Sequence, residues 1–279
     1  MHDLIVEFEP HVRLSVFLGV FALVAIWEIA APRRQLQASK AVRWASNIGI
    51  VILDTVLVRL AFPVAAAGVA AVVGSLGWGL FNVLAWPMWV EVVLAVVVLD
   101  LVIYWQHVMF HAVPGLWRLH MVHHADLDID VTTGVRFHPF EILLSMVIKM
   151  AAITALGVAP LAVIVFEIAL NATSIFNHGN VVLPSKLDRL LRLVVVTPDM
   201  HRVHHSVVAD ETNSNFGFNL PWWDRLFGTY RAQPAAGHER MTIGLEQFRD
   251  PRLQWLWHML ALPFTGAGGG YARGWRRGD

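Results

Sequence analysis

Histidines are the residues of this sequence whose number and spacing suggest chemistry. The chain has 14 histidines among 279 residues, and eight of them form three clusters at helical spacing. The clusters are the HxxxH pair His107 and His111, the HxxHH run His120, His123, His124, and the HxxHH run His201, His204, His205. Positions i, i+3 and i+4 share one face of a helix. Each HxxHH run is therefore expected to point three imidazoles into one volume, to which the HxxxH pair adds two.

Neutral imidazole is a ligand for zinc, copper, iron and nickel, and one metal takes about four to six ligands. Eight clustered histidines exceed that need, so the sequence predicts a site for two adjacent metals. The chain contains no cysteine, which excludes thiolate haem, iron–sulfur clusters and cysteine-based zinc sites. The isolated histidines are interpreted as polar anchors: His2, His11, His238 and His258.

Three further residues are candidates for positioning the ligands. Asp100 and Tyr104 precede the HxxxH pair at helical spacing and share one face with it. A carboxylate at the depth of Asp100 needs a partner in the membrane. That partner is either the second ring nitrogen of a ligand histidine or Arg59. His138 is expected to be an outer hydrogen-bond donor or a further ligand.

The composition indicates a membrane protein. Hydrophobic residues make up 56% of the chain and charged residues 15%, against roughly 25% charged in soluble domains. Basic and acidic residues number 21 each, which argues against a nucleic-acid-binding protein. Five apolar runs are candidate membrane segments: 14–31, 44–73, 89–106, 141–157 and 161–177. The expected fold is all-α, a bundle of about four transmembrane helices whose cytosolic helical cap holds the metals.

Loop charges predict how the bundle is oriented. Pro63 is expected to kink the second run, and the uncharged residues 74–86 are interpreted as a connection and not as a crossing. Basic residues gather in the 33–43 connection and after residue 177, and basic loops favour the cytosolic side. The N-terminus is then outside, and the histidine clusters lie on the cytosolic side of what the arginine-rich composition suggests is a bacterial inner membrane.

A single domain is expected over residues 1–279. Its parts are the first three spans (14–106), the first ligand segment (107–140), a transmembrane hairpin (141–177) and a C-terminal cytosolic cap (178–279).

Charged side chains also occur inside the spans. Lys149 can pair with Glu167, and Asp54 with Arg59; we interpret both as structural ion pairs, with a proton or substrate path as the alternative. The segment Pro251 to Phe264 is typical of a helix that lies in the membrane interface.

The chemistry depends on which metals are bound. An all-nitrogen site for two metals beside lipid suits either dizinc hydrolysis or oxygen activation by two irons. A site at the mouth of a helical bundle lets an acyl chain enter laterally while polar reactants arrive from water, which favours attack on a C–H bond. A metal transporter is the remaining alternative, but its ligands should lie near the bilayer midplane.

The order of the three clusters, with the hairpin between the second and the third, resembles the fatty acid hydroxylase / sterol desaturase superfamily of integral-membrane diiron oxygenases. The resemblance covers about residues 95–230. Its other matching segments are Asp100-x-x-x-Tyr104-Trp105-x-His107, Arg136-Phe137-His138-Pro139, Phe176-Asn177-His178-Gly179-Asn180, Asp199-Met200-His201-Arg202-Val203-His204-His205 and Trp223-Asp224-Arg225-Leu226-Phe227-Gly228-Thr229.

This resemblance implies a mushroom-shaped fold of four membrane helices under a cap with two irons. The eight clustered histidines would be iron ligands and His178 the ninth. Some relatives have a further histidine where this chain has Ser174, so one metal would take a water instead. The implied reaction is O2-dependent hydroxylation of an acyl, sterol-like or amino-lipid substrate. Desaturation is the first alternative, and hydrolysis of a lipid by a dizinc site is the second; zinc is also expected as a contaminant of purified protein.

The electrons for such a reaction must come from another protein. The sequence lacks the His-Pro-Gly-Gly pattern of cytochrome b5 and a dinucleotide fingerprint, so a ferredoxin or cytochrome b5 type donor is expected. Arginines predicted to be exposed would dock this donor or anionic lipid heads, or act only as a cytosolic anchor: Arg189, Arg192, Arg202, Arg249 and Arg252.

Overall fold

The fold is entirely helical. The computed structural model describes residues 2–84, 87–266 and 271, where β-structure is limited to two isolated bridges. The α-helices are α1 (His2–Ala30), α2 (Lys40–Ala61), α3 (Ala66–Ser75), α4 (Leu80–Val83), α5 (Met88–Ala112), α6 (Pro114–His124), α7 (Pro139–Leu156), α8 (Pro160–His178), α9 (Ser185–Leu191), α10 (Pro198–His204), α11 (Ala209–Thr212), α12 (Trp222–Phe227) and α13 (Leu256–Ala261). Four 3₁₀ turns complete them: η1 (Thr133–Val135), η2 (Glu246–Phe248), η3 (Pro251–Gln254) and η4 (Leu262–Phe264). The all-α prediction is confirmed.

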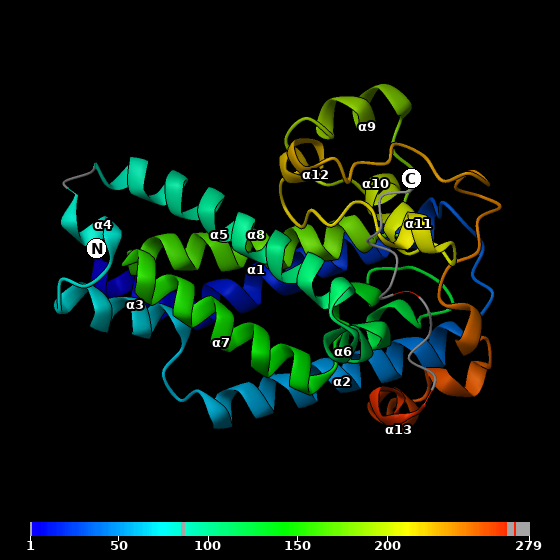
Figure 1. The fold of residues 1–279 in the computed structure, drawn as a ribbon, viewed down its shortest axis with the longest axis horizontal. Coiled ribbons are helices and arrows are strands. Elements are labelled where there is room, and N and C mark those ends of the chain that lie inside the picture. The colour runs from blue at the N-terminus through cyan, green and yellow to red at the C-terminus, as the bar shows by residue number, and fades with distance from the viewer. Residues whose placement is uncertain (1, 85–86, 267–270, 272–279) are drawn as a thin grey trace.

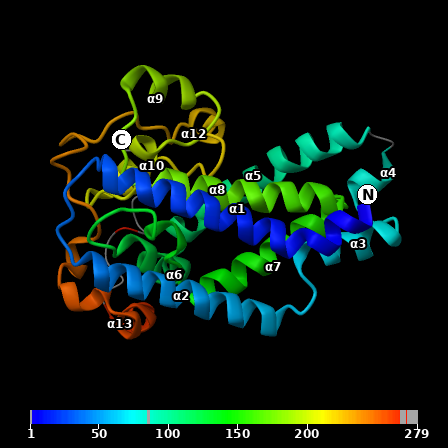
Figure 2. The same ribbon diagram turned by 180° about the vertical axis from the view of Figure 1, so that it is seen from behind.

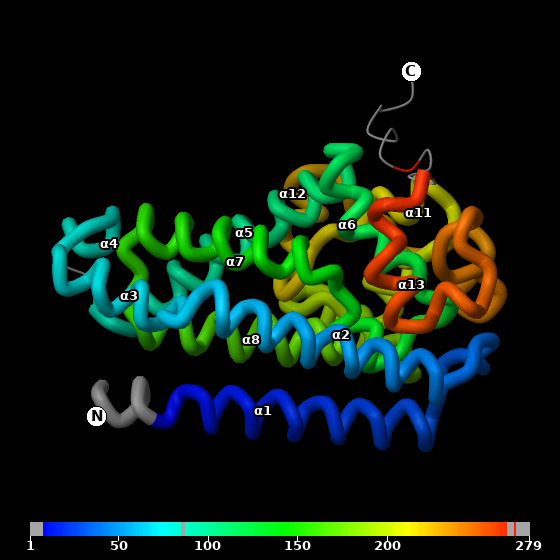
Figure 3. Tube along the Cα trace, turned by 90° about the horizontal axis from the view of Figure 1, so that it is seen from below, coloured from blue at the N-terminus to red at the C-terminus, as the bar shows by residue number. Residues whose placement is uncertain are grey.

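Five long helices form the body of the molecule. In Figures 1 and 2, α1, α2, α5, α7 and α8 run lengthwise beside one another, with α3 and α4 at one end. The short helices α6 and α9 to α13 gather at the other end as a cap. Helix α8 packs against α1, α3 and α5, while α7 packs against α2 and α3. Figure 3 shows α1 along the edge of the bundle.

The long helices have the length and apolarity of membrane spans. Five segments qualify: Phe8–Ala30, Lys40–Val83, Met88–Ala112, Pro139–Leu156 and Pro160–His178. Large apolar side chains also face outward on them, among them Leu23 at 66% exposure, Leu60 at 73% and Trp89 at 71%. Such a surface is stable in lipid and not in water. The protein is therefore a multi-pass membrane protein, as its composition predicts.

The second apolar run is interrupted at Pro63. Helix α2 ends at Ala61 and α3 begins at Ala66, so the proline breaks the helix where only a kink was expected. Helix α3 packs on α7 and α8 at the end away from the cap. Helix α5 starts at this same end and runs to the cap, so α2 and α3 belong to one candidate span, and α4 lies in the expected connection 74–86.

The α7–α8 hairpin turns at Gly157. This glycine caps α7 in the left-handed conformation with φ of 70°, which favours a residue without Cβ. A Cβ atom there would also lie 2.4 Å from the Trp78 carbonyl oxygen. Pro160 then occupies the first turn of α8, where its missing N–H leaves no helical bond unmade.

A buried arginine joins the bundle to the cap. Arg43 of α2 is fully buried, and its guanidinium donates to Asp126 at 2.5 and 2.9 Å and to Asp130 at 2.5 Å. Both carboxylates lie in the loop between α6 and η1. These buried ion pairs hold α2 and the loop together, because breaking them would leave a buried charge without a partner. This joint fixes the loop that follows the first HxxHH run.

Candidate metal centre

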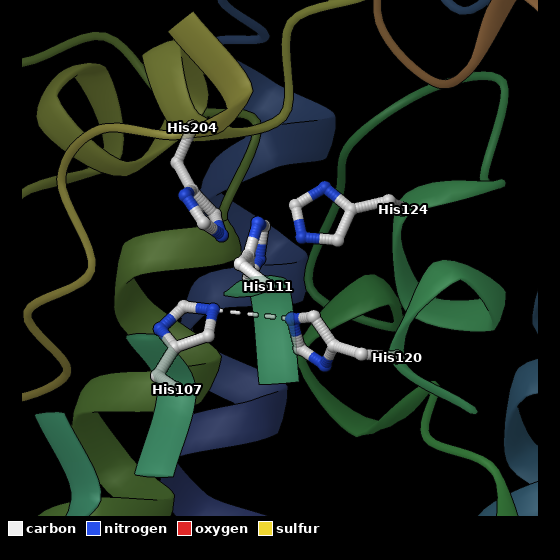
Figure 4. A group of neighbouring side chains, drawn as sticks. All are labelled: His107, His111, His120, His124 and His204. Carbon is white, nitrogen blue, oxygen red and sulfur yellow. Dashed lines mark hydrogen bonds between the residues drawn. The ribbon is translucent and has the colours of Figure 1, made fainter. Parts of the chain in front are cut away.

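All nine predicted ligands are buried and converge in two groups at the junction of bundle and cap. The first group holds His107 and His111 of α5, His120 and His124 of α6, and His204 of α10. The second group holds His123 of α6, His178 of α8, His201 of α10 and His205 directly after α10. Within each group the candidate ligand nitrogens lie within 4.8 Å of one another. Figure 4 shows the five rings of the first group pointing toward one another from α5, α6 and α10.

Each HxxHH run is divided between the two groups, which corrects the expectation that its rings share one volume. On α6, His120 and His124 turn to the first group and His123 to the second. On α10 the pattern is reversed, because His204 joins the first group and its neighbour His205 the second. Adjacent helical positions point about 100° apart. In each run the i, i+4 pair therefore faces one group, and the remaining histidine faces the other.

Six rings are held by a hydrogen bond through Nδ1. The acceptor is a backbone carbonyl in four cases: Phe216 for His107 at 2.8 Å, Ser214 for His204 at 2.8 Å, Ser174 for His178 at 2.7 Å and Arg136 for His123 at 3.2 Å. It is a side-chain oxygen in two: Glu141 for His120 at 2.7 Å and Asn213 for His111 at 3.3 Å. A carbonyl only accepts, so Nδ1 carries the proton and Nε2 presents a lone pair.

The Nε2 atoms meet in a way that suits a bound cation. His107 Nε2 lies 3.1 Å from His120 Nε2, and His178 Nε2 lies 3.1 Å from that of His123. With the protons on Nδ1, neither nitrogen of these pairs has a hydrogen to donate. Other ring nitrogens are buried without any hydrogen-bond partner: Nε2 of His111, His124 and His204, and both nitrogens of His205. Buried polar atoms are normally paired, so the donor set fits metal ions bound among the rings.

Burial keeps the rings in the form that binds metal. It lowers the pKa of His120 to about 3, because the imidazolium cannot be solvated there. It also lowers the pKa of His124 and His204 well below the usual value, and repulsion between neighbouring rings adds to the effect. A neutral imidazole is the ligand form of histidine.

Asp100 and Tyr104 do not contact the histidine rings, which corrects the prediction for Asp100. Its oxygens accept from the backbone N–H groups of Asn219 and Leu220 and from the Trp223 indole at 2.8 Å. Pairing with Arg59 is not found either. The Tyr104 hydroxyl lies 2.9 Å from Thr229 Oγ1. Asp100 therefore holds the loop between α11 and α12, whose backbone carbonyls at Ser214 and Phe216 accept from the His204 and His107 rings, while Tyr104 contacts the segment after α12.

His138 is also not where it was expected. Its Nδ1 accepts from the Phe140 N–H at 3.2 Å as the cap of α7, and its Nε2 lies 3.3 Å from the Leu260 carbonyl oxygen. The outer partner of the cluster is instead Glu141, three residues further along the chain. Sequence reasoning missed Glu141 and Asn213; the available signal was an acidic residue in the first turn of an apolar span.

Two of the predicted exposed arginines are buried. Arg202 contacts Asp199, and Arg192 contacts Asp188 at 2.7 Å. The other three, Arg189, Arg249 and Arg252, are exposed on the cap.

The segment after Asp250 forms η3, α13 and η4. Leu256 and Leu260 pack toward the cap core, whereas Trp255 and Trp257 are 40% and 59% exposed and stack with ring centroids 4.9 Å apart. This division of apolar and amphipathic faces agrees with an interfacial segment.

A cavity of about 780 Å³ connects the first histidine group to the outside of the bundle. His107, His120 and Glu141 line its inner part. Its wall toward the membrane is formed by α1 and α2, including Leu18 and Ile52, which are 53% and 59% exposed. The cavity therefore opens between these helices on a face that contacts lipid.

The predicted ion pair of Lys149 with Glu167 is confirmed, and both residues line this cavity. Arg13 of α1 joins it, with its guanidinium 2.8 Å from Glu167. The second predicted pair is absent: within the described residues Asp54 makes no ion pair, and Arg59 is exposed.

Fold and site together define a multi-pass membrane protein with a histidine-rich site, able to bind metal, beside a cavity open to lipid. The sequence model of the fatty acid hydroxylase family matches residues 92–229. Ornithine lipid hydroxylase OlsE of Rhizobium tropici is 32% identical over 226 residues, which cover 78% of this chain and 67% of that protein. The chain belongs to the fatty acid hydroxylase family, as its motifs predict.

More distant relatives have the same kind of activity in their names. Alkylglycerol monooxygenase of Homo sapiens is 28% identical over 51% of this chain and 30% of its own length. Cholesterol 25-hydroxylase of Rattus norvegicus is 26% identical over 61% of this chain and 55% of its own length. No solved structure matches the chain. The relatives are hydroxylases and monooxygenases, so the enzyme class is that of an oxidoreductase.

Proposed function

We propose that this protein is a membrane-bound diiron oxygenase that hydroxylates a C–H bond of a lipid. The observation that carries the proposal is the pair of buried histidine groups, whose Nε2 lone pairs face one another beside a cavity that opens to the membrane. Nine imidazoles match the nitrogen-rich ligand sets that iron accepts. Family membership then selects oxidation over other metal chemistry.

The residues of the chain have three tasks in this reaction. The nine rings hold the irons, and the acceptors at Nδ1 fix the orientation and tautomer of six of them. The cavity wall holds the lipid and excludes water. When bound and reduced, the two irons supply the activation of dioxygen that an unactivated C–H bond requires. Dioxygen, two electrons and two protons are consumed, and the products are the alcohol and water.

The route of the lipid follows from the packing of α1 and α2. Helix α1 packs on α8, and α2 packs on α7, so the cavity lies between these two helix pairs. Leu18 and Ile52 line the cavity and are also exposed to the membrane side. A lipid can therefore reach the site from the bilayer without entering water, while small polar reactants arrive through the cap.

The substrate class we favour is an amino lipid, in preference to a plain acyl or sterol-like lipid. The support is the name of the Rhizobium relative, an ornithine lipid hydroxylase. The names of the relatives also favour hydroxylation over desaturation and over dizinc hydrolysis.

We further propose that the protein is one domain in a bacterial inner membrane, with the histidine groups on the cytosolic side. The electron donor is then a soluble or membrane-bound protein of the ferredoxin or cytochrome b5 type. The three exposed arginines of the cap offer it a basic surface: Arg189, Arg249 and Arg252.

Reconstitution with defined metals tests this function. Metal-free protein in lipid vesicles is loaded with iron or with zinc, and lipids are analysed by mass spectrometry after incubation with isotopically heavy dioxygen and a reductant. We expect the heavy oxygen in a lipid product only with iron, reductant and dioxygen together. Turnover with zinc and without reductant would overturn the proposal.

A further inference from the structure

Two buried carboxylates line the inner part of the cavity without a matching cation. Asp54 of α2 is 5% exposed and Glu141 of α7 is 4% exposed. Asp54 has no hydrogen bond among the described residues, and its Oδ1 is fully enclosed. Glu141 uses Oε1 for the His120 ring, while its Oε2 has no partner. Both side chains line the same cavity.

Among the described residues, the lysine and arginines that line the cavity form no ion pair with Asp54 or Glu141. Lys149 and Arg13 also line the cavity, and both bind Glu167. Arg59 lies five residues beyond Asp54 on α2, where it is exposed and forms no ion pair with any described residue. An unpaired carboxylate within a membrane span is costly and marks a functional position. Asp54 also lines a cavity of lipid size, so what it lacks is a ligand.

We propose that Asp54, with Glu141 Oε2 beside it, binds the ammonium group of the lipid substrate. This inference rests on the proposed function and specifies it, because it makes a free amine the feature that the enzyme recognises. An ammonium has three N–H donors and no acceptor, which suits two carboxylates whose free oxygens have no other donor. The apolar walls from α1 and α2 then take the chains of the same lipid.

The inner position of Asp54 gives this contact a second consequence. Because Glu141 contacts the His120 ring and lines the same cavity as Asp54, an ammonium bound by both carboxylates lies beside the first histidine group. A neutral lipid of the same length would leave both carboxylates desolvated and unpaired. The site therefore selects against it, as sites built for a polar group reject analogues that lack the group.

Substrates that differ only at the amine give the first test, which needs no variant. Wild-type protein with iron, reductant and dioxygen is offered ornithine lipid with its amine free or acetylated. We expect acetylation to lower kcat/KM about 10- to 100-fold, because a hydrogen bond between charged groups is lost. Equal kcat/KM for the two lipids overturns the inference and leaves the proposed function standing. Failure to oxidise any lipid overturns the proposed function itself.

Asp54→Asn gives the second test, with binding as a readout that does not need catalysis. The metal-free variant should bind the free amino lipid about tenfold more weakly than wild type, and should bind the acetylated lipid equally well. Asp54→Glu should restore part of the preference. Asp210→Asn removes an exposed carboxylate on α11 and should change nothing. Iron content and melting temperature establish that each variant folds; an Asp54→Asn protein that still prefers the free amine contradicts the assignment.

Discussion

Each of the six anchored rings has one nitrogen committed to the protein and one directed at the other rings. The Nδ1 proton of His204 goes to the Ser214 carbonyl, and that of His178 to the Ser174 carbonyl. Both acceptors are backbone carbonyl oxygens, so a substitution of the Ser214 or Ser174 side chain would not remove them. The ring orientation is thus set by the fold, and the metal affinity depends on which rings are present.

Two single variants, each lacking one ring of one group, distinguish the two metal sites. His204→Ala in the first group and His123→Ala in the second should each lower bound iron from two per chain to about one, and abolish hydroxylation, because each site loses one of its four or five nitrogens. Both variants should insert into the membrane as wild type does. Iron is measured by elemental analysis of purified protein. The control is His11→Ala, an exposed ring outside both groups; undiminished activity of either cluster variant would remove its ring from the site.

Glu141 and His138 lie three residues apart and should differ sharply when substituted. Glu141→Gln weakens the acceptor of the His120 Nδ1–H and should lower iron affinity about 10- to 100-fold. His138→Gln removes the cap of α7 and the contact with the Leu260 carbonyl, and should cost about 1 kcal/mol of stability with iron affinity unchanged. Iron titration and thermal unfolding in detergent measure both quantities. Equal iron affinity in the two variants would show that the Glu141 contact has no effect on the metals.

The histidines of the two groups were predictable from the sequence, and the residues that support them were not. The histidine spacing is a local property of a helix, so eight of the nine residues could be named from it before the fold was known, and His178 was named from the family resemblance. The partner of His120 is Glu141, in the first turn of α7. This contact depends on how α7 packs beside α6, which no local sequence pattern shows. Asp100 shows the converse, because its helical register with His107 is right, yet its carboxylate turns outward to Trp223 and the loop after Phe218.

Among the elements, α8 connects the membrane body to the second histidine group. Its last residue is His178, and its residue Ser174 donates to the Gly134 carbonyl of η1 at 2.9 Å. The turn η1 thus packs directly against the part of α8 that fixes the ring. The sequence predicted the α7–α8 hairpin, but not this contact, because η1 is a single 3₁₀ turn without a repeating apolar pattern.

Gly134→Ala tests whether this contact positions His178. A Cβ atom at residue 134 would lie 2.7 Å from the Ser174 carbonyl oxygen and 3.2 Å from His178 Nδ1, so η1 and α8 must separate. We expect the second group to lose metal affinity about tenfold while the first group keeps its metal. Iron titration with two resolved sites measures this. Gly115→Ala is the matched control, since a Cβ atom there has no neighbour within 4 Å. Identical iron titrations of the two variants would show that η1 does not position His178.

At the scale of the whole molecule, the fold class and the two ends of the bundle follow from apolar run length and charge. The cap architecture does not, because it depends on long-range contacts such as that of Arg43 with Asp126. Arginines are mostly exposed in proteins, so sequence reasoning does not indicate a buried one. For the same reason Arg192 and Arg202 were wrongly predicted to lie on the surface. Charge counts predict which side of the membrane a loop occupies and not which of its charges are buried.

The proposed orientation has a direct test, because the chain has no cysteine of its own. Ser75→Cys places a thiol at the end of α3 away from the cap, and Ser185→Cys places one at the start of α9 on the cap; both positions are exposed. With the basic loops inside, a maleimide that cannot cross membranes should label residue 75 in intact spheroplasts and residue 185 only after lysis. The unmodified protein gives the background. The opposite pattern would place the histidine groups outside the cytosol, where a cytosolic ferredoxin could not reach them.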